Sequence, residues 1–266
     1  MGYLYETHLH TCQGSKCGRS EGKEYPAIYK ALGYDGIFVT DHFFGGNTAV
    51  PKDLPWSERV SMYMSGYYDA KEAGDRIGFP VFFGIEQNYL HDEYLIYGID
   101  EEFLLRHPDI EEWPRSQLMA EVHAYGGCAV QAHPFRERPY IKKVKLSPFT
   151  VDGIEAANIG NEPGMDLAAM SYAKTLGLPM TAGSDRHSIE NLQPERFCGT
   201  ETEEPISSSR HYAEYILSRK PLKIKYPEGR FEGAELRHPT LEVEVYGRND
   251  EIVATDAEEY LKWNLE

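Results

Sequence analysis

The sequence predicts an α/β fold, and within that class it favours a closed barrel of parallel strands over an open doubly wound sheet. Short runs rich in apolar and aromatic residues alternate with helical stretches along most of the 266 residues. Such alternation is typical of parallel strands joined by crossover helices. The sequence contains neither a G-x-G-x-x-G fingerprint nor a Walker lysine loop, which weakens the nucleotide-binding open sheet as an alternative.

Seven runs have the length and composition of strands. In chain order they are residues 2–8, 35–42, 80–88, 93–99, 127–133, 152–158 and 179–185. Five segments between or after these strand runs have the pattern expected of helices. These are residues 24–33, 58–74, 114–127, 165–177 and 208–219, many of which end in Gly, a common helix stop signal.

The chain divides into a predicted barrel domain over residues 1–226 and a C-terminal extension over residues 227–266. The extension is acidic, and its one clear strand is the alternating LEVEVYG at 241–247. We expect an appended hairpin or tail here and not an independent domain. The total length suits one large α/β domain with a substantial core.

Composition limits the partners and the compartment. A formal net charge of −16 repels polyanions, so neither a nucleic-acid polymer nor an anionic membrane is an expected partner. The four cysteines do not resemble a disulfide framework, and the start of the sequence lacks the features of a signal peptide. We therefore expect a protein of the reducing cytoplasm. The sequence leaves its oligomeric state open.

Metal-competent side chains stand at the carboxyl ends of five predicted strands. They are His8 and His10, Asp41 and His42, Glu86, His133, and Asp185 with His187. In parallel α/β architectures these ends converge on one face, so the side chains are expected to surround one cavity. His8 and His10, two residues apart, point to the same side of a strand and can chelate one ion. Mixed imidazole and carboxylate ligation suits Zn, Mn or Fe and does not suit Ca.

Four other histidines are not assigned to this site, because they lie in predicted loops, helices or the tail. They are His107, His123, His211 and His238.

The motifs that carry these residues resemble, in order, those of the PHP family, the polymerase and histidinol phosphatase metal-dependent phosphoesterases. The motifs are HLH (8–10), TDH (40–42), GIEQN (84–88), AHP (132–134) and GSDRH (183–187), and the resemblance covers residues 4 to about 190. It implies a distorted (βα)₇ TIM-like barrel with two or three divalent ions at the carboxyl end of the strands. The ligand groups that it implies are His8, His10, Glu86 and Asp185 for one ion, Glu86 and His133 for a second, and His42 with His187 for a third.

The sequence departs from the family pattern at two places. Where many members supply a further histidine after the first motif, this chain has Lys16 and Cys17, so either Cys17 is a ligand or the third ion binds weakly. Many members also place a histidine before the strand that reads here as YLIYGID. This chain has Glu93 there, with His91 two residues earlier on the same face, and we favour Glu93 as a ligand of the second ion with His91 as the alternative. A carboxylate at this position favours Mn or Fe over Zn.

The expected chemistry follows from the ions. Two divalent ions can share a bridging water, lower its pKa and present hydroxide to a phosphorus atom. The sequence shows no nucleophile turn, and neither Cys12 nor Cys17 begins a C-x₅-R loop, so we expect metal-bound hydroxide to attack without a protein nucleophile. Arg136, Arg186 and Lys16 are candidates for binding the substrate phosphate.

We therefore expect a phosphomonoesterase or phosphodiesterase, similar to a histidinol phosphatase, that acts on a small phosphorylated metabolite. Two alternatives remain open. One is a metal-dependent amidohydrolase acting on a C–N bond, which also uses an HxH motif and a terminal Asp on a barrel. The other is a non-catalytic metal-binding module. The order of the motifs favours the phosphoesterase.

Overall fold

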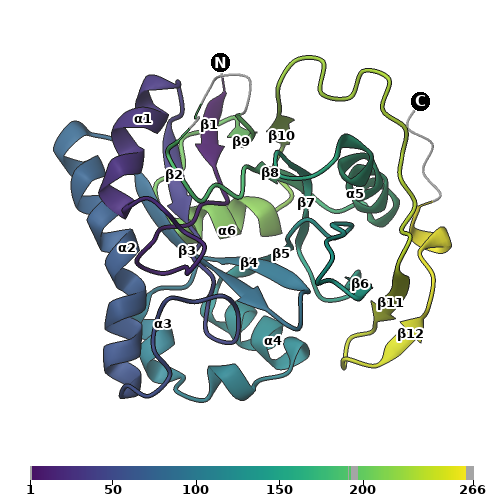
Figure 1. Cartoon of the computed structure of the whole chain (residues 1–266), viewed down its shortest axis with the longest axis horizontal. Coiled ribbons are helices and arrows are strands. Elements are labelled where there is room, and N and C mark those ends of the chain that lie inside the picture. The colour runs from purple at the N-terminus through teal and green to yellow at the C-terminus, as the bar shows by residue number, and fades with distance from the viewer. Residues whose placement is uncertain (1, 191, 193–196, 262–266) are drawn as a thin grey trace.

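A curved, nearly closed sheet forms the centre of the computed structural model, which describes residues 2–190, 192 and 197–261 (Figure 1). Within those residues the sheet has nine strands in the order β10-β9-β1-β2-β3-β4-β5-β7-β8. Their bounds are β1 Tyr3–Glu6, β2 Gly36–Val39, β3 Val81–Asn88, β4 Glu93–Tyr97, β5 Cys128–Gln131, β7 Gly153–Asn158, β8 Met180–Gly183, β9 Gly199–Thr202 and β10 Leu222–Lys225. The seven predicted strand runs correspond to β1, β2, β3, β4, β5, β7 and β8.

The nearly closed sheet is consistent with the expected TIM-like barrel, but parallel pairing holds for only part of it. The pairs β1–β2, β2–β3, β5–β7 and β7–β8 are parallel, but β4 is antiparallel to both of its neighbours, β3 and β5. Only residues 89–92 separate β3 from β4, and a parallel crossover needs a dozen residues or more. Strands β9 and β10 add two further antiparallel pairs beside β1.

The ends of β1 and β8 meet and close the barrel on the side of the predicted site. Leu9 forms a parallel bridge with Arg186. His10 N donates to Arg186 O at 2.8 Å, and Arg186 N donates to His8 O at 3.3 Å. Two segments about 180 residues apart in the chain, both bearing predicted ligands, are therefore joined through their backbones.

Six α-helices lie within the described residues. They are α1 Tyr25–Ala31, α2 Trp56–Ile77, α3 Glu101–Arg106, α4 Arg115–Tyr125, α5 Pro163–Leu176 and α6 Ser209–Leu217. All but α3 correspond to predicted helices. The predicted stop at Gly74 is wrong, because α2 continues to Ile77 and ends at Gly78, whose φ of 61° is the left-handed conformation that favours glycine. Gly74 instead gives room to the returning chain, since a Cβ there would lie 2.5 Å from Phe79 O.

Helix α6 packs against aromatic residues of the sheet and lies behind its centre in Figure 1. The ring of Tyr212 in α6 contacts Phe38 of β2 and Tyr97 of β4, with centroids 4.7 and 5.0 Å apart, and all three side chains are buried. Aromatic pairs of this kind contribute strongly to a core because they bury large apolar areas.

The segment after residue 226 returns across the barrel and pairs with an insertion between β5 and β7. Strand β11 (Glu242–Tyr246) is parallel to β6 (Lys143–Leu146) and antiparallel to β12 (Ile252–Ala254). Val245 of β11 is fully buried in the main core. The side chain of Arg115 adds a polar connection, because it binds both Asp92 and Asp250.

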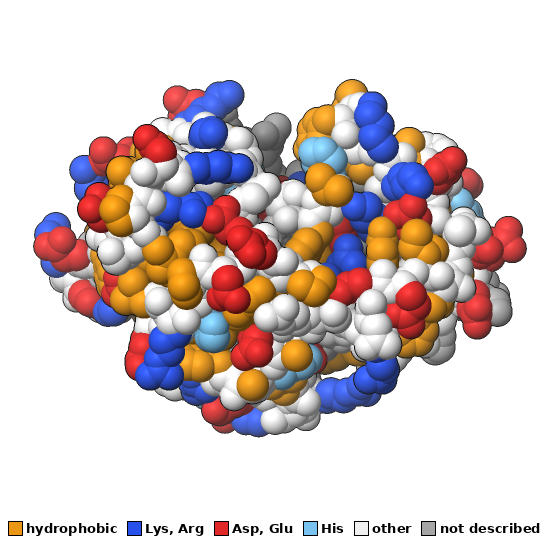
Figure 2. Space-filling model, turned by 90° about the horizontal axis from the view of Figure 1, so that it is seen from below, with side chains coloured by type: hydrophobic (Ala, Val, Ile, Leu, Met, Phe, Trp, Pro, Cys, Tyr) orange, Lys and Arg blue, Asp and Glu red, His pale blue; other side chains and the backbone are white. Residues whose placement is uncertain are grey.

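On the face shown in Figure 2, acidic and basic side chains are interspersed with hydrophobic ones. Within the described part of the chain, no helix is long and apolar enough to cross a membrane.

Candidate metal centre

The strands bring the predicted ligands to one end of the barrel. His8 and His10 follow β1, His42 follows β2, Glu86 lies in β3, His133 follows β5, and Asp185 and His187 follow β8. Glu93 begins β4 and reaches the same end because β4 runs antiparallel to its neighbours. The reversal that departs from the predicted topology therefore places Glu93 beside the other side chains.

Glu86 is the centre of the group. Its side chain is fully buried, and Oε1 lies 3.0 Å from His8 Nε2 and 3.3 Å from His133 Nε2. Oε2 lies 2.6 Å from His42 Nδ1 and 3.5 Å from His10 Nε2. One carboxylate thus faces four imidazoles, as expected of a ligand shared between ions.

Asp185 and Glu93 lie near different histidines of the group around Glu86. Asp185 Oδ1 lies 3.1 Å from His10 Nε2 and 3.5 Å from His8 Nε2. Glu93 Oε2 lies 3.5 Å from His133 Nε2, and Glu93 Oε1 accepts a hydrogen bond from Asn88 Nδ2 at 2.7 Å. In each of four overlapping sets, the potential ligand atoms lie within 4.8 Å of one another. The sets are His8, His10 and Asp185; His8, Glu86 and His133; His42, Glu86 and Glu93; and His10, His42 and His187.

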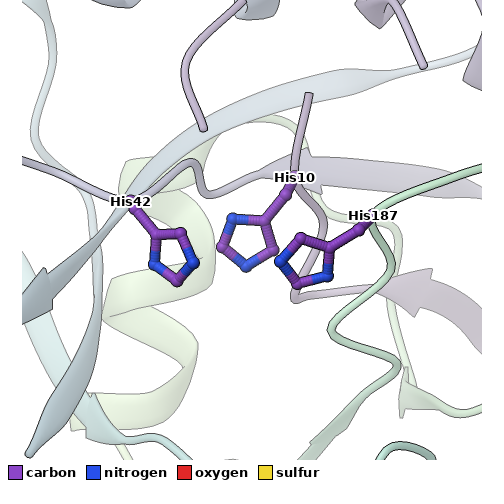
Figure 3. A group of neighbouring side chains, drawn as sticks. All are labelled: His10, His42 and His187. Carbon is purple, nitrogen blue, oxygen red and sulfur yellow. The ribbon is translucent and has the colours of Figure 1, made fainter. Parts of the chain in front are cut away.

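The last of these sets is drawn in Figure 3, where the three imidazoles lie side by side with His10 in the middle. The ring centroid of His10 is 4.3 Å from that of His42 and 4.3 Å from that of His187. The Cys17 thiol is hydrogen bonded to His42 and His187. Burial would raise the pKa of Cys17, but these hydrogen bonds lower it to about 6, which favours the thiolate form that binds metals.

The donor atoms fit divalent cations. Four of them are buried without a hydrogen-bond partner of good geometry in the described structure: His8 Nε2, His10 Nε2, His42 Nδ1 and Glu86 Oε2. Because His8 Nδ1 donates to Glu155 Oε1 at 2.9 Å, a neutral His8 presents a lone pair at Nε2. Nε2 faces Glu86 Oε1 at 3.0 Å, so a proton or a metal ion lies between the two atoms. Burial would lower the pKa of His8, but Glu155, Glu86 and Asp185 raise it well above its usual value, so a metal ion would take the place of that proton.

The charge states suit the same role. Burial would raise the pKa of Glu86, but His8 and His42 hold it well below its usual range. Burial together with His187 and His42 keeps the pKa of His10 well below its usual value. Glu86 is therefore ionised and His10 is neutral, the forms in which these groups bind metals. Nearby carboxylates, Glu86 among them, raise the pKa of His8 and His42 well above its usual value despite burial, so these two imidazoles would release a proton when a metal binds.

Side chains behind the ligands fix their orientation, and the sequence analysis did not identify them. Glu155 of β7 accepts from His8 Nδ1 and, through Oε2, from His133 N at 3.0 Å. Ser15 Oγ lies 3.0 Å from His10 Nδ1. The one signal that would have pointed to Glu155 was a carboxylate between apolar residues in the middle of the run DGIEAAN.

Asp41, predicted as a possible ligand, lies behind the site. Its Oδ1 accepts from Thr11 N and from Ser15 Oγ, both at 2.7 Å, and its Oδ2 accepts from Thr11 Oγ1 at 2.7 Å. These bonds occupy the carboxylate and orient Ser15 toward His10. The structure thus places Asp41 in support of a ligand and outside the four ligand sets.

Of the two alternatives for the second ion, Glu93 lies in the candidate site and His91 lies outside the ligand sets. His91 is exposed, adopts a positive φ of 72°, and contacts the ring of Tyr140 at the rim of the cavity. Only Glu93 of the two belongs to a ligand set.

Of the three candidate phosphate-binding residues, Arg136 and Arg186 line cavities beside the candidate site and Lys16 does not. Arg136 is buried and donates through Nη1 to Asp185 Oδ2 at 2.5 Å and through Nε to Asn161 Oδ1 at 2.7 Å. It lines a cavity of about 570 Å³ beside His42, Glu93 and His187. Arg186 lines an adjoining cavity of about 660 Å³. Lys16 is exposed and lines neither cavity.

Two of the ligand-bearing turns have unusual backbone conformations. His133 has a φ of 29° and Asp185 a φ of 51°, values that non-glycine residues rarely adopt. Such conformations cost on the order of 1–3 kcal/mol each and cluster at functional sites. The backbone strain therefore coincides with the proposed ligands.

Comparisons with known proteins show a solved structure that shares the fold of this chain. No family model matches the chain, and no curated protein matches it. A solved structure from Bacteroides vulgatus, a two-domain protein containing a predicted PHP-like metal-dependent phosphoesterase, is 14% identical with a TM-score of 0.57. The match covers 86% of this chain and 66% of that one. This likeness shows that the two proteins share a fold.

Two further solved structures are similar at a TM-score of 0.49. One, described as a metal-dependent phosphoesterase from Bifidobacterium adolescentis, is 16% identical over 82% of this chain and 96% of that one. The other, an amidohydrolase from Chromobacterium violaceum, is 17% identical over 85% of this chain and 98% of that one.

Proposed function

We propose that this protein is a metal-dependent phosphoesterase of the PHP type that hydrolyses a phosphate ester of a small metabolite. The observation that carries the proposal is the position of Glu86, whose two oxygens face four imidazoles while Asp185 and Glu93 flank it. Two or three divalent ions, Mn, Fe or Zn, would be held by His8, His10, His42, Glu86, Glu93, His133, Asp185 and His187. When bound, such ions lower the pKa of a coordinated water and neutralise charge on a phosphoryl group.

The residues of the chain prepare this centre. Glu155 holds the tautomer of His8 that presents Nε2, and Ser15 does the same for His10 through its Nδ1. Asn88 orients Glu93. Preorganisation of this kind reduces the reorganisation needed during the reaction.

Arg136 is the residue that we assign to the substrate phosphate. Its Nη1 and Nε are held by Asp185 and Asn161, whereas its Nη2 is buried and has no hydrogen-bond partner in the described structure. A phosphate oxygen would satisfy this donor, and guanidinium groups bind phosphate strongly. Arg136 also supplies positive charge at a site in an acidic protein.

The test is a panel of phosphate monoesters, phosphate diesters and carboxamides, assayed with Mn, Fe or Zn while bound metal is quantified. We expect hydrolysis of at least one class of phosphate ester and two or more metal equivalents per chain. Hydrolysis of amides alone would identify an amidohydrolase. Full metal content without any turnover would support a non-catalytic module, and less than one equivalent after loading would overturn the metal site.

A chiral thiophosphate ester gives a second readout. A single in-line displacement by water inverts the configuration at phosphorus, and we expect inversion. Retention would indicate two displacements through a covalent intermediate, for which Cys17 would be the nearest candidate nucleophile.

A further inference from the structure

We propose that Arg230 is a positioning residue for Arg136, so that the segment after residue 226 completes the phosphate-binding part of the site. This inference rests on the proposed function. It assigns a role in substrate binding to a part of the chain that lies outside the predicted barrel.

Arg230 is inserted into the turn that follows β7. Its side chain is 8% exposed and donates from Nη2 to Asp166 Oδ2 at 2.6 Å, to Asn158 O at 2.8 Å and to Asn161 O at 3.1 Å. Its Nε donates to the same Asp166 oxygen at 3.1 Å. One guanidinium thus holds both ends of the turn over residues 158–161 against the first turn of α5.

The side chain of Asn161 connects this turn to Arg136 through hydrogen bonds. Asn161 Nδ2 donates to Asp166 Oδ1 at 2.9 Å, which fixes the amide so that its Oδ1 accepts from Arg136 Nε at 2.7 Å. Arg136 Nη1 then reaches Asp185 Oδ2. The chain of contacts from Arg230 to a proposed metal ligand is therefore continuous and consists of charged or amide groups.

Burial leaves these groups little freedom to rearrange. Asp166 is fully buried and Asn161 is 8% exposed, so water cannot readily replace a lost partner. The remaining donor of Arg136, Nη2, lies 3.4 Å from the position that a Cβ would take at Gly160, in the middle of the turn that Arg230 holds. A shift of that turn would change the surroundings of Nη2, the Arg136 nitrogen that has no hydrogen-bond partner in the described structure.

The chemistry of arginine is needed at position 230. A lysine could keep one ion pair with Asp166, but its single ammonium cannot reproduce the fork that binds a carboxylate and two carbonyls together. Arg230→Lys therefore keeps the buried positive charge but loses the planar fork of donors that binds the carboxylate and the two carbonyls together. Lys225→Ala is the control, because Lys225 in β10 makes a surface ion pair with Glu201, at a distance from the turn over residues 158–161 in the chain.

The experiment measures the affinity of the metal-loaded protein for inorganic phosphate by calorimetry, together with KM and kcat for a hydrolysed ester. We expect Arg230→Lys to weaken phosphate binding and raise KM by about tenfold or more, because small displacements of binding groups are costly. Metal content and kcat should change little, whereas the melting temperature should fall because buried carbonyl groups lose their donor. Arg136→Lys should weaken phosphate binding as well, and the double variant should be no weaker than the worse single variant, since both act through one group.

Three results would overturn the inference. Phosphate affinity in Arg230→Lys equal to that of the Lys225→Ala control would remove Arg230 from the site and leave the proposed function standing. Effects of Arg230→Lys and Arg136→Lys that simply add would show that Arg230 acts independently of Arg136. A wild-type protein that neither binds phosphate nor hydrolyses any ester would overturn the inference together with the proposed function.

Discussion

The Nδ1 atom of His8 lies 2.9 Å from Oε1 of Glu155, and both side chains are fully buried. The contact joins the segment that follows β1 to β7, and these two strands are not neighbours in the sheet. It also decides which nitrogen of His8 faces Glu86. A hydrogen bond behind a histidine ligand thereby becomes part of the metal centre.

Replacing Glu155 by Gln should weaken metal binding about 10- to 100-fold, because the amide can accept only one of the hydrogen bonds in the same way and no longer carries charge. Competition with a chromogenic chelator measures the affinity directly. Glu214→Gln, on the exposed side of α6, is the matched control. Equal affinities in the two variants would show that Glu155 does not orient His8.

Removing a central ligand should have a larger effect. We expect His8→Ala and Glu86→Ala each to lower turnover by more than about a hundredfold, a loss of roughly 3 kcal/mol in transition-state stabilisation. The control is His238→Ala, an exposed histidine outside the ligand sets. A near-normal rate in either ligand variant, measured on the same ester, would exclude that residue from the site.

Cys17 can be tested by spectroscopy. If its thiolate binds the ion near His42 and His187, the cobalt-loaded protein should show a sulfur-to-cobalt charge-transfer absorption in the near ultraviolet. Cys17→Ser should lose this absorption and one metal equivalent, while Cys12→Ser should keep both. Full metal content in Cys17→Ser with turnover abolished would instead contradict attack by water alone.

The pair His123 and Asp152, remote from the metal centre, predicts a pH-dependent stability. His123 Nε2 lies 2.7 Å from Asp152 Oδ2, and the hydrogen bond raises the pKa of His123 in the folded state above that in the unfolded state. Its contribution is therefore complete below about pH 6.5 and is lost as the pH rises through the raised pKa. Because the His123 side chain is 40% exposed, solvent screening keeps the contribution below about 1 kcal/mol.

His123→Gln should accordingly reduce the free energy of unfolding at about pH 5.5 and have little effect at about pH 9. Urea denaturation at the two pH values measures the difference. A loss of equal size at both would show that the ionised histidine makes no contribution.

The clustering of the candidate ligands could be predicted from the sequence because of one geometrical rule. Residues at the carboxyl ends of parallel strands meet, so His8, His133 and Asp185 could be grouped without knowing the exact strand order. Glu93 did not follow from that rule, since it begins an antiparallel strand. Its assignment came from the resemblance to a family, and the short hairpin over residues 89–92 supplies the physical reason.

The supporting residues could not be predicted in this way. Glu155, Asn161 and Arg230 belong to long-range polar contacts, and such contacts leave no periodic pattern in a sequence. The pairing of β6 with β11 joins segments about 100 residues apart. The sequence of each segment alone indicates at most a short strand and does not indicate its partner. Predicting these features requires the three-dimensional arrangement, because the partners are specified by position in space and not by spacing in the chain.

The bridge between Leu9 and Arg186 has a consequence for how the protein acquires its metal. During synthesis the residues around His8 leave the ribosome first, but their partners around Asp185 emerge only after most of the barrel has been made. A nascent chain therefore carries an incomplete set of candidate ligands until the residues around Asp185 have emerged. The candidate ligand sets that include Asp185 or His187 are complete only when the two ends of the barrel come together. If the protein has the proposed function, we therefore expect metal loading to follow closure of the barrel.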